Sequence, residues 1–240
     1  MKNLIKNSKR ALLGAAAAMS LVLAPGLAQA EKATGPVEGL WKYTGLTSSS
    51  GVDMPLTGIF LLADGYFLQQ AVFNGEPVSM QQAMAHSGTY STTPKGINLE
   101  ADQTLGFAPK QQPALSDAGA TQHELSVTRE GDSMQLVFGS GTVQGLAKLG
   151  DANDAEVFRL ENGMLAFADG YFVLVDGGAE AAVTGYGQYS KDGDMYRLDI
   201  IRWSEGTATV SQNLGELAVL ARFDGKVLEL ADGRRLTVAR

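Results

Sequence analysis

The sequence predicts an all-β, antiparallel fold made of two related barrel or half-barrel units, and three observations support this prediction. Short apolar runs alternate with turn signals, Asp-Gly pairs recur between those runs, and little of the chain has the 3.6-residue period of a helix. The eleven-residue stretch 57–67 also returns in altered form at 162–172, with the early Gly and Ala-Asp-Gly-Tyr-Phe kept. The repeat indicates that one β unit occurs twice.

The first thirty residues have the parts of a secretory signal peptide. A positive region with four basic residues precedes an apolar run at 11–23, and Ala28-Gln29-Ala30 matches a cleavage site. The apolar run is too short to span a bilayer. We therefore expect a signal peptide over residues 1–30, a periplasmic or secreted protein with a mature chain from about Glu31, and no stable membrane anchor.

Charge and cysteine content limit the possible partners. Without residues 1–30 the chain keeps 15 basic and 26 acidic residues, a net charge of −11. Such an acidic surface repels phosphate backbones, so a nucleic-acid partner is not expected. The chain has no cysteine, which excludes disulfides, thiol nucleophiles and Cys-ligated metals, so the fold must depend on its apolar core.

The first copy begins with a strand at Gly39–Tyr43, on which Trp41 and Tyr43 share one face. Asp64-Gly65 and Asp169-Gly170 are each expected to form a two-residue hairpin turn, so these aspartates are interpreted as turn residues and not as catalysts. Residues 80–84 are predicted to form a short helix that places Met80 and Met84 on one face. The stretch 104–122 contains two prolines and is predicted to be a long loop.

The second copy is expected to start at Gly145, because residues 145–149 resemble residues 39–43, with Ala147 in place of Trp41. The predicted domains are therefore 31–144 and 145–240. Farther along, residues 196–200 alternate between apolar and polar side chains, and Ile201 breaks this alternation, which predicts a β-bulge.

The two copies differ in ways that favour the first as the functional one. Residue spacing indicates two insertions in the first copy, and each insertion lies next to one of the two histidines of the chain, His86 and His123. The first copy also has Trp41. We therefore place the candidate site in the first copy.

Gly39-Leu40-Trp41 on an opening strand resembles the glycine-x-tryptophan motif of lipocalins, and the Asp-Gly-Tyr hairpin with Gly-x-Tyr-Ser resembles bacterial lipocalin-like domains of the calycin kind. The resemblance implies an up-and-down barrel that takes a small apolar ligand at its mouth. It also implies that Trp41 packs at the closed end against an Arg near the end of the chain. The closing strand of the first copy offers only Lys148 for that role.

The motifs do not point to a cofactor or a catalytic apparatus. His86 and His123 lack a metal-ligand spacing, and the chain has no nucleophile elbow and no glycine-rich phosphate loop. No metal, no cofactor and no assigned catalytic residue are therefore expected.

The preferred hypothesis is that the first copy binds a small hydrophobic molecule. The expected ligand-binding residues are Trp41, Met80, Met84, His86 and Tyr90, with the methionines forming an adaptable wall. One alternative is a non-metal cyclase or isomerase that uses Glu100 or His86 for acid–base work in the barrel cavity. Another is a periplasmic protein-binding or inhibitor module that uses the 104–122 loop.

Overall fold

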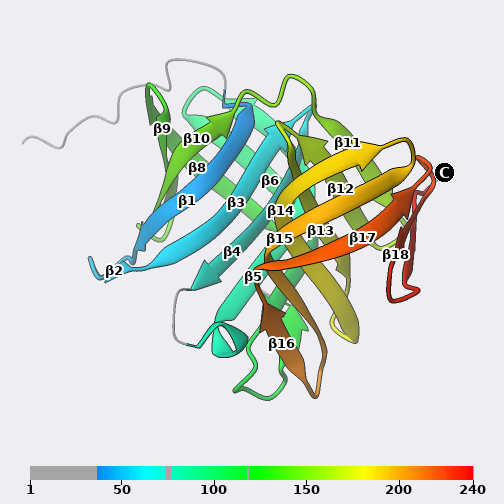
Figure 1. The fold of residues 1–240 in the computed structure, drawn as a ribbon. Helices are drawn as coiled ribbons and strands as arrows, with labels where there is room; N and C mark the ends of the chain where they lie inside the picture. Colours follow the sequence, from blue (N-terminus) through cyan, green and yellow to red (C-terminus); the bar gives the residue numbers. More distant parts are fainter. Residues whose placement is uncertain (1–36, 74–76, 118, 240) are drawn as a thin grey trace, which may run out of the picture. The chain divides into compact units, whose positions relative to one another are not determined.

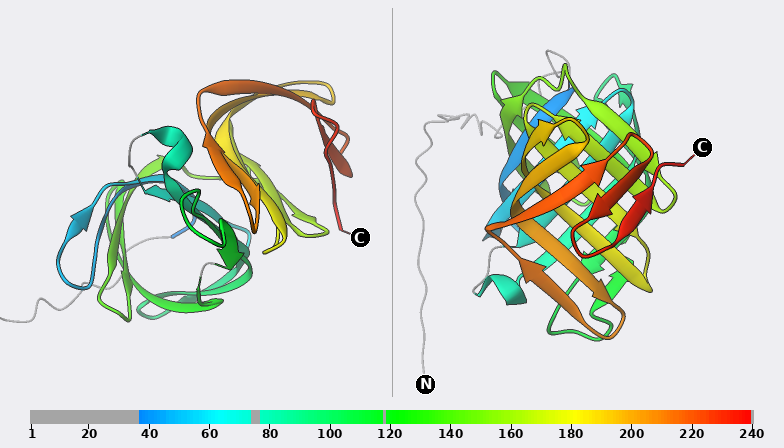
Figure 2. Two further views of the ribbon diagram at one scale, coloured as in Figure 1. Left: turned by 90° about the horizontal axis from the view of Figure 1, so that it is seen from below. Right: turned by 45° about the vertical axis from the view of Figure 1, so that its right-hand side comes forward.

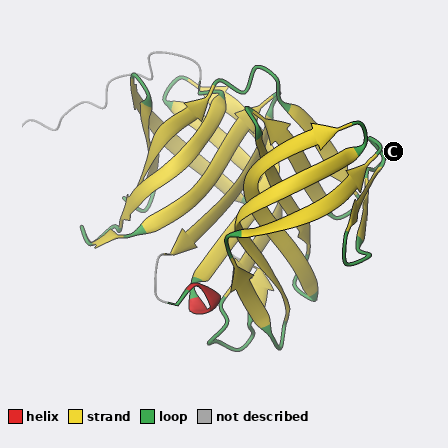
Figure 3. Cartoon of the chain, in the orientation of Figure 1, coloured by secondary structure: helices red, strands yellow, loops and turns green. Residues whose placement is uncertain are grey.

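The computed structural model describes residues 37–73, 77–117 and 119–239. The predicted signal peptide, residues 1–30, lies outside the described residues. Glu31–Arg240 forms one compact unit, and its described part is almost entirely antiparallel β-structure, which confirms the predicted all-β class (Figures 1 and 3). Over the described residues, no helix has the length and hydropathy needed to cross a membrane.

The first sheet closes on itself. Eight strands form a ring in the order β10-β9-β8-β6-β5-β4-β3-β1, because β10 pairs with β1 along most of its length (Figure 2). The strands β2 and β7 pair at the rim with β1 and β6. The bounds are β1 (Gly39–Thr47), β2 (Asp53–Met54), β3 (Leu56–Ala63), β4 (Tyr66–Phe73), β5 (Gln82–Thr93), β6 (Gly96–Phe107), β7 (Leu115–Asp117), β8 (Gln122–Glu130), β9 (Ser133–Phe138) and β10 (Val143–Gly150).

The second sheet repeats this order and stays slightly open. Its strands run in the order β11-β12-β13-β14-β15-β17-β18-β19. The short strand β16 pairs with β15 outside this order, just as β7 pairs with β6 in the first sheet. A single bridge, Leu160↔Val238, links the two edges within the described residues. The bounds are β11 (Glu156–Leu160), β12 (Gly163–Ala168), β13 (Tyr171–Gly177), β14 (Ala181–Asp192), β15 (Met195–Thr207), β16 (Ser211–Leu214), β17 (Leu217–Phe223), β18 (Val227–Leu230) and β19 (Arg235–Thr237).

The local turn signals are confirmed at equivalent places in the two barrels. Asp64 and Asp169 have φ of 51° and 49°, and the following glycines both have φ of 77°, as a type I′ turn requires. The predicted bulge is also present: Tyr186 pairs with Arg202 and Gly187 with Ile200, which leaves Ile201 as the extra residue. The first barrel has the same irregularity between β5 and β6.

Three expectations about segments need correction. The predicted domain boundary at 144/145 falls inside β10, whose residues pair with β1 and β9, so the two sheets divide between Gly150 and Glu156. The stretch 145–149 is thus the neighbour of Trp41 and not its counterpart. The counterpart is Phe158, which faces Leu165 as Trp41 faces Phe60.

The predicted helix at 80–84 is wrong. Of the described residues 77–84, only Val78–Met80 is helical, as the 3₁₀ turn η1. The strand β5 begins at Gln82 because this segment pairs with β4, with Met84 opposite Ala71. The predicted 104–122 loop is wrong in part, since this stretch contains the end of β6, all of β7 and the first residue of β8. Its remaining loop docks on the second barrel, where the Ala114 amide donates to the Ala208 carbonyl (2.8 Å).

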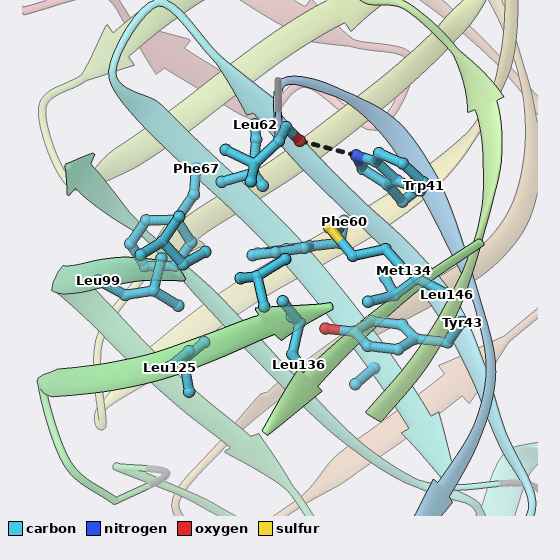
Figure 4. Close-up of a cluster of buried hydrophobic side chains, with 14 of the residues drawn as sticks. Trp41, Tyr43, Phe60, Leu62, Phe67, Leu99, Leu125, Met134, Leu136 and Leu146 are labelled. Atoms are coloured by element: carbon cyan, nitrogen blue, oxygen red, sulfur yellow. Dashed lines mark hydrogen bonds between the residues drawn. The ribbon is translucent and has the colours of Figure 1, made fainter. Parts of the chain in front are cut away.

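Each barrel has its own apolar interior. Figure 4 shows the first, in which side chains from opposite walls meet and the Trp41 indole donates to the Val37 carbonyl (3.2 Å). The second interior is rich in aromatic rings, with Phe167 in ring contact with Phe158, Tyr189, Tyr196 and Phe223. Burial of these two clusters is the main source of stability, as expected for a fold without disulfides.

The outer faces of the two barrels share a third apolar cluster. It joins β1, β3 and β4 to β12, β13 and β14. Beside it lies a buried chain of polar groups: Gln70 Nε2 donates to Ser204 Oγ (3.1 Å), Ser204 Oγ donates to Asn213 Oδ1 (2.6 Å), and Asn213 Nδ2 donates to the Gln81 carbonyl. These side chains are buried, so the hydrogen bonds fix how the barrels meet.

Candidate ligand-binding site

The first barrel encloses a cavity of about 210 Å³ near the end at which β4 finishes and β5 starts. Aliphatic and aromatic side chains such as Phe60, Leu125 and Leu136 form most of its wall. Pockets for drug-sized ligands measure about 300–1,000 Å³, so this cavity suits a smaller guest. Its polar lining comes from six residues on the strands β4, β5, β8 and β10 and in the turn between β9 and β10: Gln69, His86, His123, Ser140, Thr142 and Gln144.

A hydrogen-bonded chain orders the polar side of this cavity. The Tyr43 hydroxyl donates to Gln69 Oε1, and Gln69 Nε2 lies 2.8 Å from His86 Nδ1. Because an amide nitrogen can only donate, Nδ1 accepts, and the proton of the neutral His86 ring is on Nε2. Complete burial raises the pKa of Tyr43 far above its usual range, so this hydroxyl stays a neutral donor.

The two histidines come together although 37 positions separate them in the sequence. The His86 and His123 rings are stacked, with centroids 6.4 Å apart and planes inclined by 12°. The His123 ring also meets the Phe138 ring edge-on at 5.5 Å. The pair supplies hydrogen-bonding nitrogen atoms inside a largely apolar space. Among the described residues, no three or more His, Asp or Glu side chains are arranged to hold a metal ion.

The strand register allows a position-by-position comparison of the two interiors. Gln69 faces His86 across β4 and β5, and Leu174 faces Gly185 across β13 and β14. Leu99 pairs with His123, and the equivalent Leu198 pairs with Val219. Gln69, His86 and His123 therefore correspond to Leu174, Gly185 and Val219, none of which has a polar side chain.

The second barrel fills the equivalent space with an indole ring. His86 pairs with Thr104, and the corresponding pair is Gly185 with Trp203. A Cβ atom on Gly185 would lie 2.2 Å from Trp203 Cε3, so the indole lies directly on this glycine. Trp203 is 4 % exposed, and its Nε1 donates to Glu205 Oε2 (3.0 Å). The two barrels therefore have the same strand arrangement but different side chains at their centres.

The structure brings together two of the five predicted ligand-binding residues. Met84 and His86 line the cavity. Met80 lies in η1, outside the cavity wall. Trp41 is fully buried within the core, and Tyr90 lies beside the 64–65 turn, where its hydroxyl donates to Glu38 Oε1 (2.7 Å). Burial, then the contact with Glu38, raises the pKa of Tyr90. Neither Trp41 nor Tyr90 faces the cavity.

The sequence reasoning missed Gln69, His123 and Gln144 as lining residues. An alignment of the two copies could have identified Gln69. Phe67-Leu68-Gln69-Gln70 aligns with Phe172-Val173-Leu174-Val175, so Gln69 is polar where the second copy has an apolar residue. The closing strand β10 offers only Lys148 to Trp41, as expected, but an Arg of β8 also lies over the ring. The Arg129 guanidinium lies 5.3 Å from the centre of the Trp41 ring, and Lys148 Nζ lies 5.9 Å from it.

No protein-family model matches the sequence, and neither a curated protein nor a solved structure is significantly similar to it.

Proposed function

We propose that the first barrel is a lipocalin-like domain that binds a small, mostly apolar molecule with a hydrogen-bonding group. The observation that carries this proposal is the contrast between the two interiors. The first keeps a cavity with ordered polar groups at positions where the second has aliphatic side chains, a glycine and a covering indole. A cavity with few, well-placed polar groups is the usual form of a small-molecule site.

The polar side of the cavity defines the orientation of the guest. Its hydrogen-bonding group would lie toward Gln69 and His86, and its apolar part toward Phe60, Leu125 and Leu136. A lipocalin-like assignment is further supported by the Gly39-Leu40-Trp41 strand and by Arg129 over the Trp41 ring. We also propose that the protein is exported and begins at about Glu31 after cleavage, which N-terminal sequencing of the natural protein would check.

The matched variant for testing ligand binding comes from the second barrel. The double substitution His86→Gly with Thr104→Trp copies the Gly185–Trp203 pair and is designed to fill the first cavity with an indole in place of the His86 ring and its contacts with Gln69 and His123. Toluene is a suitable probe, because apolar cavities of about 150 Å³ take up benzene. We expect the natural protein to retain a small molecule in native mass spectrometry. We also expect the recombinant protein to bind toluene and the double variant to lose this binding.

The proposal fails if the natural protein carries no small molecule and the recombinant protein takes up no toluene. It fails also if the folded double variant binds toluene as well as the original chain does. A retained circular-dichroism spectrum and thermal midpoint would show that the variant is folded.

A second function, catalysis by His86, is favoured by the Tyr43–Gln69–His86 chain, which holds a buried imidazole in one tautomer. The other predicted acid–base residue, Glu100, is exposed on the outer face. Conversion of the retained molecule by the purified protein, lost in His86→Asn, would distinguish an enzyme from a carrier.

A further inference from the structure

The mouth of the second barrel contains a pocket that the first-barrel hypothesis does not use. It measures about 640 Å³, within the range of small-molecule sites. It is open because β11 ends at Leu160 and β19 has three residues, whereas β1 and β10 continue to the rim of the first barrel. Trp203 is nearly fully buried beside it, so a guest would stay at the mouth.

One carboxylate in this pocket has no counter-charge. Asp176 follows Phe172 and Leu174 on the inner face of β13, at the position that is Ala71 in the first barrel. Within the described residues, no hydrogen bond and no ion pair reaches the Asp176 carboxylate. Burial, with a smaller contribution from Glu161, raises the pKa of Asp176. A partly desolvated carboxylate without a partner is stabilised by a cation that enters the pocket.

Among the described residues of the pocket wall, the one cationic side chain is already engaged. Arg234 Nη1 donates to Glu205 Oε2 (2.7 Å), and its Nε donates to Asp232 Oδ2 (2.7 Å). The described wall therefore has three carboxylates and one guanidinium, a net charge of −2 when all are ionised, and the guanidinium is bound to the two carboxylates other than Asp176. The remaining wall includes Val183, Val210 and Leu236, which offer apolar contact beside the charge.

We propose that the mouth of the second barrel is a separate binding site for a small molecule with an apolar body and a cationic amine, which Asp176 receives. The amine would donate to the Asp176 carboxylate, and the apolar body would lie against Val183 and Leu236. This site does not depend on the function proposed for the first barrel, because Asp176 and the histidines face different interiors.

Benzylamine is the probe, and benzyl alcohol is its neutral counterpart. By calorimetry at low salt, we expect benzylamine to bind, benzyl alcohol to bind far more weakly, and Asp176→Asn to weaken benzylamine binding by about tenfold. The matched control is Asp192→Asn, at the far end of β14 from the pocket, which removes the same charge and should leave binding unchanged. Amide NMR shifts caused by benzylamine should centre on residues 181–183.

Three results would overturn this proposal. They are no benzylamine binding up to millimolar concentrations, equal binding by Asp176→Asn and the original chain, and equal loss in Asp192→Asn. The variant His86→Gly/Thr104→Trp separates the two sites: if it also loses benzylamine, the amine binds in the first barrel and the second-barrel site is rejected. If it keeps benzylamine and loses toluene, both proposals stand.

Discussion

Replacing Trp203 by alanine should empty the centre of the second barrel. The indole is 4 % exposed and lies against Gly185, so almost all its surface is withdrawn from water. Loss of a buried Trp or Phe side chain costs about 3–5 kcal/mol, because apolar transfer energy is lost and a cavity remains. The loss of the indole hydrogen bond adds little, since Glu205 still accepts from Gln212 and Arg234. A cost near 4 kcal/mol is a large part of a typical folding stability of about 5–15 kcal/mol.

The cost is measured by urea unfolding followed by far-ultraviolet circular dichroism, which does not depend on the lost fluorophore. We expect the midpoint to fall by about 1–2 M at an unchanged slope. Val210→Ala, on the β15–β16 hairpin and 63 % exposed, is the control and should change the stability by less than about 0.5 kcal/mol. A cost for Trp203→Ala below about 1 kcal/mol would refute the view that this indole fills the barrel.

Three further predictions concern the turn, the contact between barrels and pH. Gly65→Ala should lower the unfolding free energy by about 1–2 kcal/mol, because Gly65 has φ of 77°, although a Cβ atom there would meet no neighbour. The control is Gly139→Ala, which should be nearly neutral, because a Cβ at Gly139 also meets no neighbour and its φ is not positive. Asn213→Ala should cost about 1–3 kcal/mol by removing partners of Ser204 and the Gln81 carbonyl, whereas the exposed Asn98→Ala should not. The pKa of Asp176 is raised mainly by burial and to a smaller extent by the negative charge of Glu161. Stability from its proton is therefore present at acidic pH and is lost as pH rises through the folded pKa, so Asp176→Asn should stabilise the protein at pH 7 and not near pH 3. Unfolding measured at both pH values checks this, and an equal effect at both would contradict it.

The features that the sequence predicts correctly depend on near neighbours. An Asp-Gly pair needs only its own backbone angles to define a hairpin, and the break in alternation at Ile201 needs only the adjacent residues to indicate a bulge. The start of the second copy depends on more distant pairing. Residues 145–149 resemble an opening strand because they are apolar at the same period, but their partner is β1 itself.

The candidate site is harder to predict because it also depends on pairing between strands that are distant in the sequence. Which side chains meet inside a barrel depends on the register of many strands, and no local pattern brings His123 to His86. Helical spacing at Met80 and Met84 is outweighed by the hydrogen bonds that β5 makes with β4. Divergence between the copies was the useful signal, and alignment by strand register extends it to Gln69 and Leu174, and to His123 and Val219.

The face through which the barrels meet stays apolar in both copies, unlike the two interiors. Ile59, Leu61 and Leu68 are buried there with their counterparts Met164, Ala166 and Val173, so both halves use the same patch, as the subunits of a two-fold dimer do. A substitution on such a patch changes the fit to the other half, so both copies must stay apolar there. Among the described residues, the two interiors form separate apolar clusters, so each can change without altering the other. The duplicated fold can therefore keep one stable interface while one barrel holds a polar cavity and the other is filled by an indole ring.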